Sequence, residues 1–138
     1  MLLTSQIAYT ALSVGNAKVD ELQEPSCLAV VDAGGNLIAF LRTHNAAFGV
    51  ADLAINKAYT ASALKVATSE LYSGAQPGGE IFGITHAAGR PFVVFGGGLP
   101  IVHQGNVIGA VGVSGGPVSA DLEIAGAMLS SIHSSLDA

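Results

Sequence analysis

The sequence predicts an α+β domain in which helices pack against one antiparallel sheet of five strands. Three runs near the middle of the chain are rich in β-branched residues and separated by glycine clusters, which is typical of consecutive antiparallel strands: 92–95, 99–103 and 107–113. Two more strands should form a hairpin nearer the N-terminus. Because strand and helix do not alternate as they do around parallel sheets, the sheet should be antiparallel.

The first part of the chain should form a helix and then a β-hairpin. Thr4 or Ser5 can cap a helix that ends before Pro25, since apolar residues recur there at helical spacing. The runs 27–31 and 37–42 flank an Asp-Ala-Gly-Gly-Asn segment, which is a strong turn signal. We expect these two runs to pair as neighbouring strands.

A long helix with a smooth face should follow the hairpin. Residues 48–67 contain no proline, and alanine recurs at positions 51, 54, 58, 61 and 63. Such a stripe lets a helix lie very close to a partner surface. A loop rich in glycine then occupies residues 72–79.

The last predicted strand should lie at the centre of the sheet. Residues 107–113 are apolar on both faces of a strand, and Gly109 and Gly112 suggest that another backbone comes close. The preceding turn is predicted to be type II′, with Gly105 as the first of its two central residues. Ser119 can cap a final helix, whose first-turn acids favour the helix dipole.

The composition predicts a single domain, residues 1–138, that assembles with copies of itself. Only 11% of the residues are charged, against about 25% in average proteins. This is few for a surface fully exposed to water, so we expect part of it to be buried in a homo-oligomer.

Charge and cysteine content exclude several classes of partner. The net charge is −5 and the five Lys and Arg residues are scattered, so nucleic acid is not an expected partner. The N-terminus lacks the pattern of a signal peptide, and no run approaches the ~18 apolar residues of a membrane span, so we expect a cytoplasmic protein. Cys27 is alone, which excludes an intrachain disulfide or a thiolate zinc cage.

Two tempting motifs are better explained by structure. Residues 112–116 match the G-x-S-x-G pattern of a nucleophile elbow, but that motif belongs to a parallel sheet in a longer chain. The glycines there can simply let the chain turn off the strand. The four histidines, at positions 44, 86, 103 and 133, share no metal-ligand spacing, so we predict no metal site.

Lys57 is the residue around which a ligand site is predicted. Its neighbours on the helix are uncharged, so its ammonium either reaches the rim or is buried against an anion. The nearest acidic candidate is Glu80, as the salt-bridge partner of Lys57 or as a general base. We predict a small-anion pocket where the start of this helix, the His44 loop and the loop ending at Glu80 meet. The ligand-binding candidates are Arg42, His44, Lys57, Glu80 and Gly97, and the candidates for catalysis, if the protein is an enzyme, are Lys57, Glu80 and His44.

Several motifs resemble the GlcG/HbpS family, which includes the C-terminal domain of PduO-type corrinoid adenosyltransferases and is often labelled a haem-degrading domain. They are the hairpin VVDAGGNLIAFLR, D-x-A-x-x-K-A-Y-T-A from Asp52 to Ala61, P-G-G-E-I-F-G-I from Pro77 to Ile84, and the glycine-rich blocks GGGLPI and GNVIGAVGVSGG. The resemblance covers essentially the whole chain. It implies a profilin- or PAS-like fold around a five-stranded antiparallel sheet, homo-oligomers from tetramer to octamer, and genes near those for glycolate, diol or glycerol utilisation.

The resemblance further implies haem in some members and iron in a secreted member. This chain has no His in its first helix to serve as an axial ligand, and Glu70 and Glu80 are too far apart to replace the E-x-x-E pair that is associated with iron in the secreted member. Three functions remain open. The protein is an oligomeric small-molecule-binding protein accessory to a catabolic pathway, with an acidic metabolite as ligand, or a haem or corrinoid carrier, or a cofactor-free lyase, isomerase or hydrolase acting on an organic acid.

Overall fold

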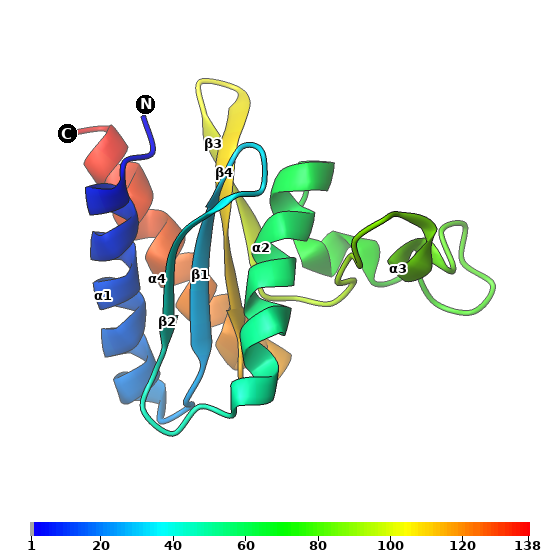
Figure 1. Cartoon of the computed structure of the whole chain (residues 1–138), viewed down its shortest axis with the longest axis horizontal. Coiled ribbons are helices and arrows are strands. Elements are labelled where there is room, and N and C mark those ends of the chain that lie inside the picture. The colour runs from blue at the N-terminus through cyan, green and yellow to red at the C-terminus, as the bar shows by residue number, and fades with distance from the viewer. Residues whose placement is uncertain (1) are drawn as a thin grey trace.

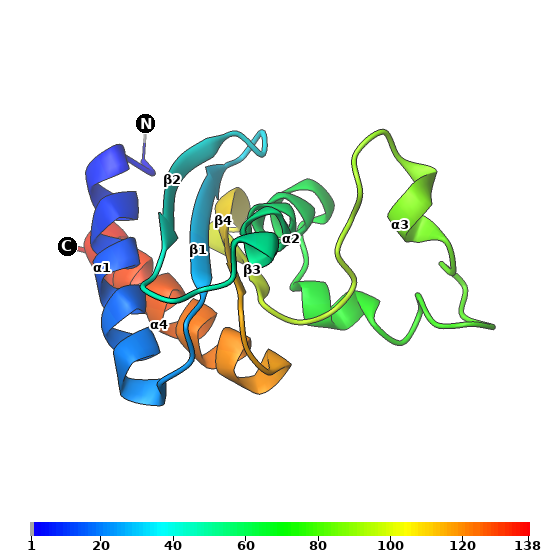
Figure 2. The same cartoon turned by 60° about the horizontal axis from the view of Figure 1, so that its bottom comes forward.

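The computed structural model describes residues 2–138 and has the predicted α+β architecture (Figure 1). One antiparallel sheet has four strands in the order β2-β1-β4-β3. Helices α1 and α4 cover one face of this sheet, and α2 covers the other (Figure 2). The elements in chain order are α1 (Ser5–Leu22), β1 (Cys27–Asp32), β2 (Leu37–Arg42), the 3₁₀ helix η1 (Phe48–Val50), α2 (Ala51–Leu64), the 3₁₀ helix η2 (Thr68–Leu71), α3 (Ile84–Ala87), β3 (Gly98–His103), β4 (Asn106–Ser114) and α4 (Val118–Leu136).

The prediction of a fifth strand at residues 92–95 is wrong. The backbone N–H of Val93 donates to the Thr60 hydroxyl of α2 at 2.9 Å, outside the sheet. The ring of Phe92 stacks on that of Tyr59, with their centroids 6.1 Å apart. Side chains of α2 therefore engage the polar and aromatic groups of this segment, and it is held without strand pairing.

Strand β4 lies between β1 and β3, which confirms the prediction of a central strand. A Cβ added at Gly112 would collide with the backbone of α2 at Ala54 and Ala58. Ala54, Ala58 and Ala61 are themselves fully buried. The surface that the alanine stripe approaches is therefore this chain's own sheet.

The two faces of the sheet carry cores of different composition. Between the sheet and α2, the buried residues are mostly small, with Cys27 among the alanines. Between the sheet and the α1/α4 layer they are larger, and include Leu28, Ile101, Ile124 and Met128. Small side chains bring α2 close to the sheet, whereas large ones fill the wider space on the other face.

Both predicted hairpin turns form, but the second differs in type. The Asp32 carboxylate closes the first turn by accepting hydrogen bonds from two backbone N–H groups. In the second hairpin His103 pairs with Asn106, so the two central residues are Gln104 and Gly105. Their φ angles are +50° and +80°, which makes the turn type I′ rather than II′.

Helix boundaries follow the predicted caps only in part. The Thr4 side chain accepts from the N–H of Ile7 at 3.2 Å, which confirms it as the cap of α1. The long helix divides into η1 and α2, and α2 ends before Lys65, which has a positive φ of 59°. Helix α4 begins at Val118 directly after a proline, so Ser119 lies within the first turn and the prediction that it caps the helix is wrong.

Residues 72–91 form an arm that projects from the body and carries α3 (Figures 1 and 2). Where the arm returns, the Arg90 guanidinium lies 3.9 Å from the centroid of the Tyr59 ring and donates to Asn56 Oδ1 at 2.9 Å. Phe82 on the arm is 65% exposed. The arm is therefore tied to α2 at its base while it presents an aromatic ring to the surroundings.

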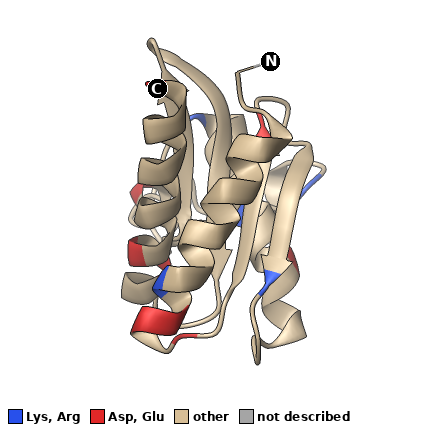
Figure 3. Ribbon diagram, turned by 90° about the vertical axis from the view of Figure 1, so that its left-hand side faces the viewer, with Lys and Arg blue, Asp and Glu red and all other residues tan. Residues whose placement is uncertain are grey.

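The face formed by α1 and α4 carries few charged residues, and most of its ribbon in Figure 3 is neither basic nor acidic. The ion pairs there join Lys18 to Glu21 and to Glu123 at the end where α4 begins. Among residues 2–138, no helix is both long enough and apolar enough to cross a membrane.

The close contact between β4 and α2 predicts a strong asymmetry between two glycine-to-alanine changes. Gly112→Ala drives a methyl group into the α2 backbone, so we expect a loss of about 1–3 kcal/mol or more in the free energy of unfolding. Gly126→Ala is the matched control, because Gly126 lies within α4 and an added Cβ meets no atom within 4 Å. It should stabilise by about 0.5–1 kcal/mol. Urea denaturation measures both, and equal effects would contradict the packing described.

Candidate functional site

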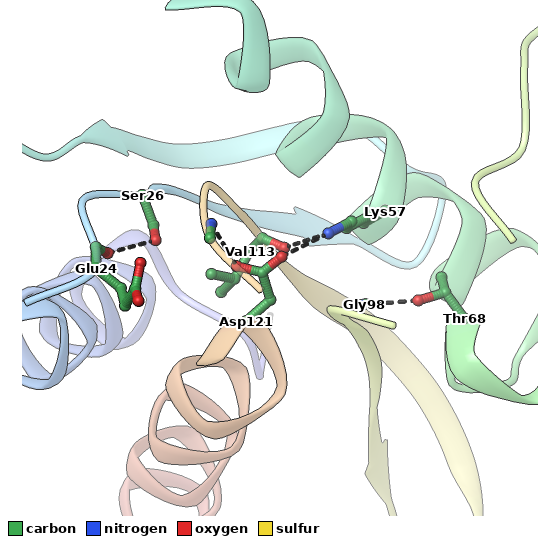
Figure 4. Close-up of polar contacts among 8 residues, drawn as sticks. Glu24, Ser26, Lys57, Thr68, Gly98, Val113 and Asp121 are labelled. Carbon is green, nitrogen blue, oxygen red and sulfur yellow. Dashed lines mark hydrogen bonds and ion pairs between the residues drawn. The ribbon is translucent and has the colours of Figure 1, made fainter. Parts of the chain in front are cut away.

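Lys57 extends from α2 into the interior and is fully buried (Figure 4). Its Nζ donates to Asp121 Oδ2 at 3.1 Å and to the Val113 carbonyl oxygen at 2.9 Å. The buried alternative for Lys57 is therefore correct. The anion that it meets is Asp121, so the prediction of Glu80 as its salt-bridge partner is wrong.

Asp121 comes from the helix layer on the opposite face of the sheet. It is 2% exposed, and its Oδ1 also accepts from the N–H of Gly116 at 3.4 Å. From the sequence, the acids in the first turn of this helix were expected only to interact favourably with the helix dipole. The sequence did contain one indication that Asp121 is buried, because it lies at helical spacing from the apolar residues Ala125, Met128 and Ile132, which are all buried.

Phe95 and Gly97 cover the ammonium group of Lys57. Nζ lies 5.0 Å from the centroid of the Phe95 ring, within the range of a cation–π interaction. A Cβ at Gly97 would lie 2.8 Å from Nζ, and the φ of this residue is +130°. Of the other four predicted ligand-binding candidates, Gly97 is the one that lies beside Lys57.

Burial and pairing act in opposite directions on the two charged groups. Burial lowers the pKa of Lys57, while the Asp121 carboxylate and its hydrogen bond raise it. Burial likewise raises the pKa of Asp121, which the Lys57 ammonium lowers. The ammonium meets a carboxylate, a carbonyl oxygen and an aromatic face, so the charged form of the pair is well solvated by the protein.

The remaining candidates lie on other segments. Arg42 is exposed and donates to the Ala46 carbonyl oxygen at 2.9 Å. His44 is exposed and lines a pocket of about 190 Å³ beside Asp20 and Glu24. Glu80 is exposed on the projecting arm. Among the described residues, the His44 loop, the Glu80 loop and Lys57 do not come together in one pocket, so that prediction is wrong.

A pocket of about 430 Å³ is lined in part by Phe95, the residue whose ring lies against the Lys57 ammonium. It is formed where the root of the arm, the loop before β3 and the first residue of α4 meet, and its lining residues are Ser69, Tyr72, Phe95, Gly96 and Val118. We name it the Phe95 pocket. Two other pockets, of about 420 and 360 Å³, lie between α1 and β2 and beside the β1–β2 turn. None of these four pockets is lined by Lys or Arg.

The serine of the G-x-S-x-G pattern does not stand on a nucleophile elbow. Ser114 is 4% exposed and lies within β4, paired with Cys27 of β1 in an antiparallel sheet. Within residues 2–138, no group of three His, Cys, Asp or Glu side chains is placed to hold a metal ion.

The buried pair predicts a large effect of Asp121→Asn. This change leaves the Lys57 ammonium buried without a counter-charge, so we expect a loss of about 3–5 kcal/mol in the free energy of unfolding. The double variant Lys57→Met/Asp121→Asn removes both charges and should recover at least ~2 kcal/mol of that loss. Denaturant titrations of the four members of the cycle measure the coupling, and additive losses would show that the pair is not an ionic unit.

The pH dependence of Asp121→Asn tests the same point independently. Without the carboxylate, the charge and hydrogen bond that raise the pKa of Lys57 are lost while burial remains, so this pKa falls further below the ordinary value of 10.5. The folded variant then binds fewer protons than its unfolded chain near neutral pH, and its free energy of unfolding rises as the pH increases. The deficit relative to the unsubstituted protein should shrink between about pH 7 and about pH 10. A deficit that stays constant over this range would contradict a buried charge at Lys57.

Two relatives share much of this sequence. The chain is 44% identical over 105 residues to an uncharacterized 15.0 kDa protein in the dhaT-dhaS intergenic region of Citrobacter freundii, covering 76% of this chain and 74% of that protein. It is 36% identical over 134 residues to the corrinoid adenosyltransferase PduO of the same organism, covering 96% of this chain but 40% of PduO. The chain therefore spans less than half the length of that enzyme.

A solved structure and a family match agree with these relatives. The crystal structure of a PduOC:haem complex superposes with a TM-score of 0.89 at 32% sequence identity, covering 94% of each chain. Residues 3–130 match the family described as haem degrading protein HbpS-like. This match covers nearly all of the chain and confirms the resemblance drawn from its motifs: the protein belongs to the HbpS-like family.

Proposed function

We propose that the protein is a homo-oligomeric small-molecule-binding protein accessory to a catabolic pathway, and that its ligand occupies the Phe95 pocket. The observation that carries this proposal is the position of Phe95. Its ring lies against the ammonium of the buried Lys57, and the same residue lines the pocket. The pocket thus has a wall held in place by the interior of the protein, which is the preorganisation that ligand sites require.

The pathway role is supported by a relative rather than by geometry. The chain that is 44% identical is encoded between the dhaT and dhaS genes. Its placement between two other genes favours a shared task with their products, as the sequence resemblance implied.

An acidic ligand loses its main support. That expectation depended on Lys57 as a free cation, whereas Asp121 engages it, and none of the four pockets is lined by another Lys or Arg. The cofactor-free enzyme is likewise weakened, because Lys57 is sealed and the His44 and Glu80 side chains lie on other, exposed segments.

A ligand screen by thermal denaturation tests the proposed function. Hydroxy acids, keto acids, diols and aldehydes are added to the protein and to Phe95→Ala, which removes the wall of the pocket. We expect at least one compound to raise the melting temperature of the protein but not that of the variant. Stabilisation that persists in Phe95→Ala would place the ligand elsewhere.

Haem is the second candidate, favoured by the PduOC:haem structure. The residues present fit it poorly. His44 lines a pocket of only about 190 Å³. His86 is exposed and its ring shares a hydrogen bond with the Thr85 hydroxyl, and the Nε2 atom of His133 is buried. No His lines the pocket of about 420 Å³ between α1 and β2 or the Phe95 pocket of about 430 Å³. A corrinoid that needs an imidazole ligand meets the same difficulty.

We therefore expect haem binding to be weak or peripheral. Titration with haem should give a broad, poorly saturating Soret band, because no imidazole is placed in a large pocket. The controls are His44→Ala and His103→Ala. A sharp six-coordinate spectrum that survives both changes would require another ligand and would overturn this expectation.

Assembly into a homo-oligomer remains a prediction. Besides the low charge content, Phe48 and Phe82 are 85% and 65% exposed, which is costly for aromatic rings in a monomer. Light scattering at micromolar concentration should report several copies. A monomer mass would contradict the proposal, and Phe82→Ser should shift the equilibrium toward smaller species if the arm lies in the interface.

A further inference from the structure

The lining of the Phe95 pocket is suited to binding an aromatic ring. Two of its five lining residues are aromatic, and both are partly exposed, Tyr72 at 55% and Phe95 at 37%. Leaving aromatic rings in water is unfavourable, and an aromatic ring packed against them restores the lost contacts. A volume of about 430 Å³ falls within the range of small-molecule sites and suits a compound of one or two rings.

The ring of Phe95 is fixed from behind. The centroid of the ring lies 5.0 Å from Lys57 Nζ, and Nζ itself donates hydrogen bonds to Asp121 and to the Val113 carbonyl oxygen. The neighbouring Gly96 cannot be enlarged, because an added Cβ would lie 2.7 Å from Val118. A ligand therefore meets an aromatic wall that needs little ordering on binding.

The polar groups of the pocket are neutral. The lining contains the hydroxyl groups of Ser69 and Tyr72 and the main chain of Gly96, which has no side chain to cover it. None of the hydrogen bonds found among residues 2–138 uses either hydroxyl, so both are available to a ligand.

Formal charge argues against an anionic ligand in this pocket. No charged residue lines it, and the Lys57 ammonium that lies against Phe95 is already paired with Asp121. The net charge of −5 on the chain also disfavours the approach of an anion. A carboxylate placed here would lose water without gaining a counter-charge.

We propose that the Phe95 pocket binds a neutral, planar heteroaromatic ring. The ring lies against Phe95 and Tyr72, and polar groups on its edge bond to the hydroxyls of Ser69 and Tyr72 or to the main chain of Gly96. This inference rests on the proposed function, since it concerns the same pocket, and it names the class of ligand.

Nicotinamide and nicotinate form a matched pair of probes, because both carry the same pyridine ring and differ in the charge of one substituent. Saturation-transfer NMR with competition titrations measures their affinities for the full chain. We expect nicotinamide to bind at least about tenfold more tightly than nicotinate, since the anion finds no counter-charge. Glycolate, an acid without a ring, should not compete.

Variants locate the bound probe. Tyr72→Ala and Phe95→Leu each remove one aromatic side of the pocket. Each should weaken the affinity for nicotinamide about 2- to 12-fold, the range for loss of one aromatic pair. Tyr9→Ala is the matched control, because Tyr9 is also exposed but lines the separate pocket between α1 and β2. It should leave the affinity unchanged. Circular dichroism checks that each variant is folded.

The outcomes separate this inference from the proposed function. If nicotinate or glycolate binds as tightly as nicotinamide and Tyr72→Ala weakens it, the pocket is a ligand site but the assignment of neutral rings is wrong. If nicotinamide does not bind, or binds equally to Tyr72→Ala and Phe95→Leu, the inference is overturned, while a stabilising metabolite lost in Phe95→Ala would still support the proposed function.

Discussion

The ion pair between Lys57 and Asp121 is the interaction on which the rest of the structure depends. Lys57 belongs to the helix on one face of the sheet and Asp121 to a helix on the other, and they meet at the Val113 carbonyl of β4. The pair therefore joins all three layers. Neither charge could be buried alone, because an isolated ion in the interior costs several kcal/mol even after the protein relaxes.

The smooth contact between α2 and the sheet makes this pair geometrically feasible. Gly112 and the alanines of α2 bring the helix against β4, so a single lysine side chain can reach past the strand. Gly97 leaves room for Nζ, and Phe95 closes the space above it. Packing and electrostatics are coupled here: a larger side chain at any of these glycines would displace the cation from its partner.

Family membership and the chemistry of the site make different statements about this protein. The fold is shared with a domain crystallised with haem, at a TM-score of 0.89. The side chains that line the pocket between α1 and β2 and the Phe95 pocket offer aromatic rings and hydroxyls rather than imidazoles or cations. A common backbone can therefore present unrelated ligand chemistry, because affinity depends on side chains that the fold does not require.

The sequence by itself determined the α+β class, the central position of β4, the first hairpin and the close approach at Gly112, because each follows from local pattern or from glycine geometry. It also singled out Lys57, since a charge on an apolar helix face needs an anion. Only the tertiary structure identified that anion, because Asp121 lies 64 positions away and no local spacing relates the two. The same limit explains why residues 92–95 were predicted as a strand from their composition. They instead contact Thr60 and Tyr59, which only the tertiary structure brings close to them.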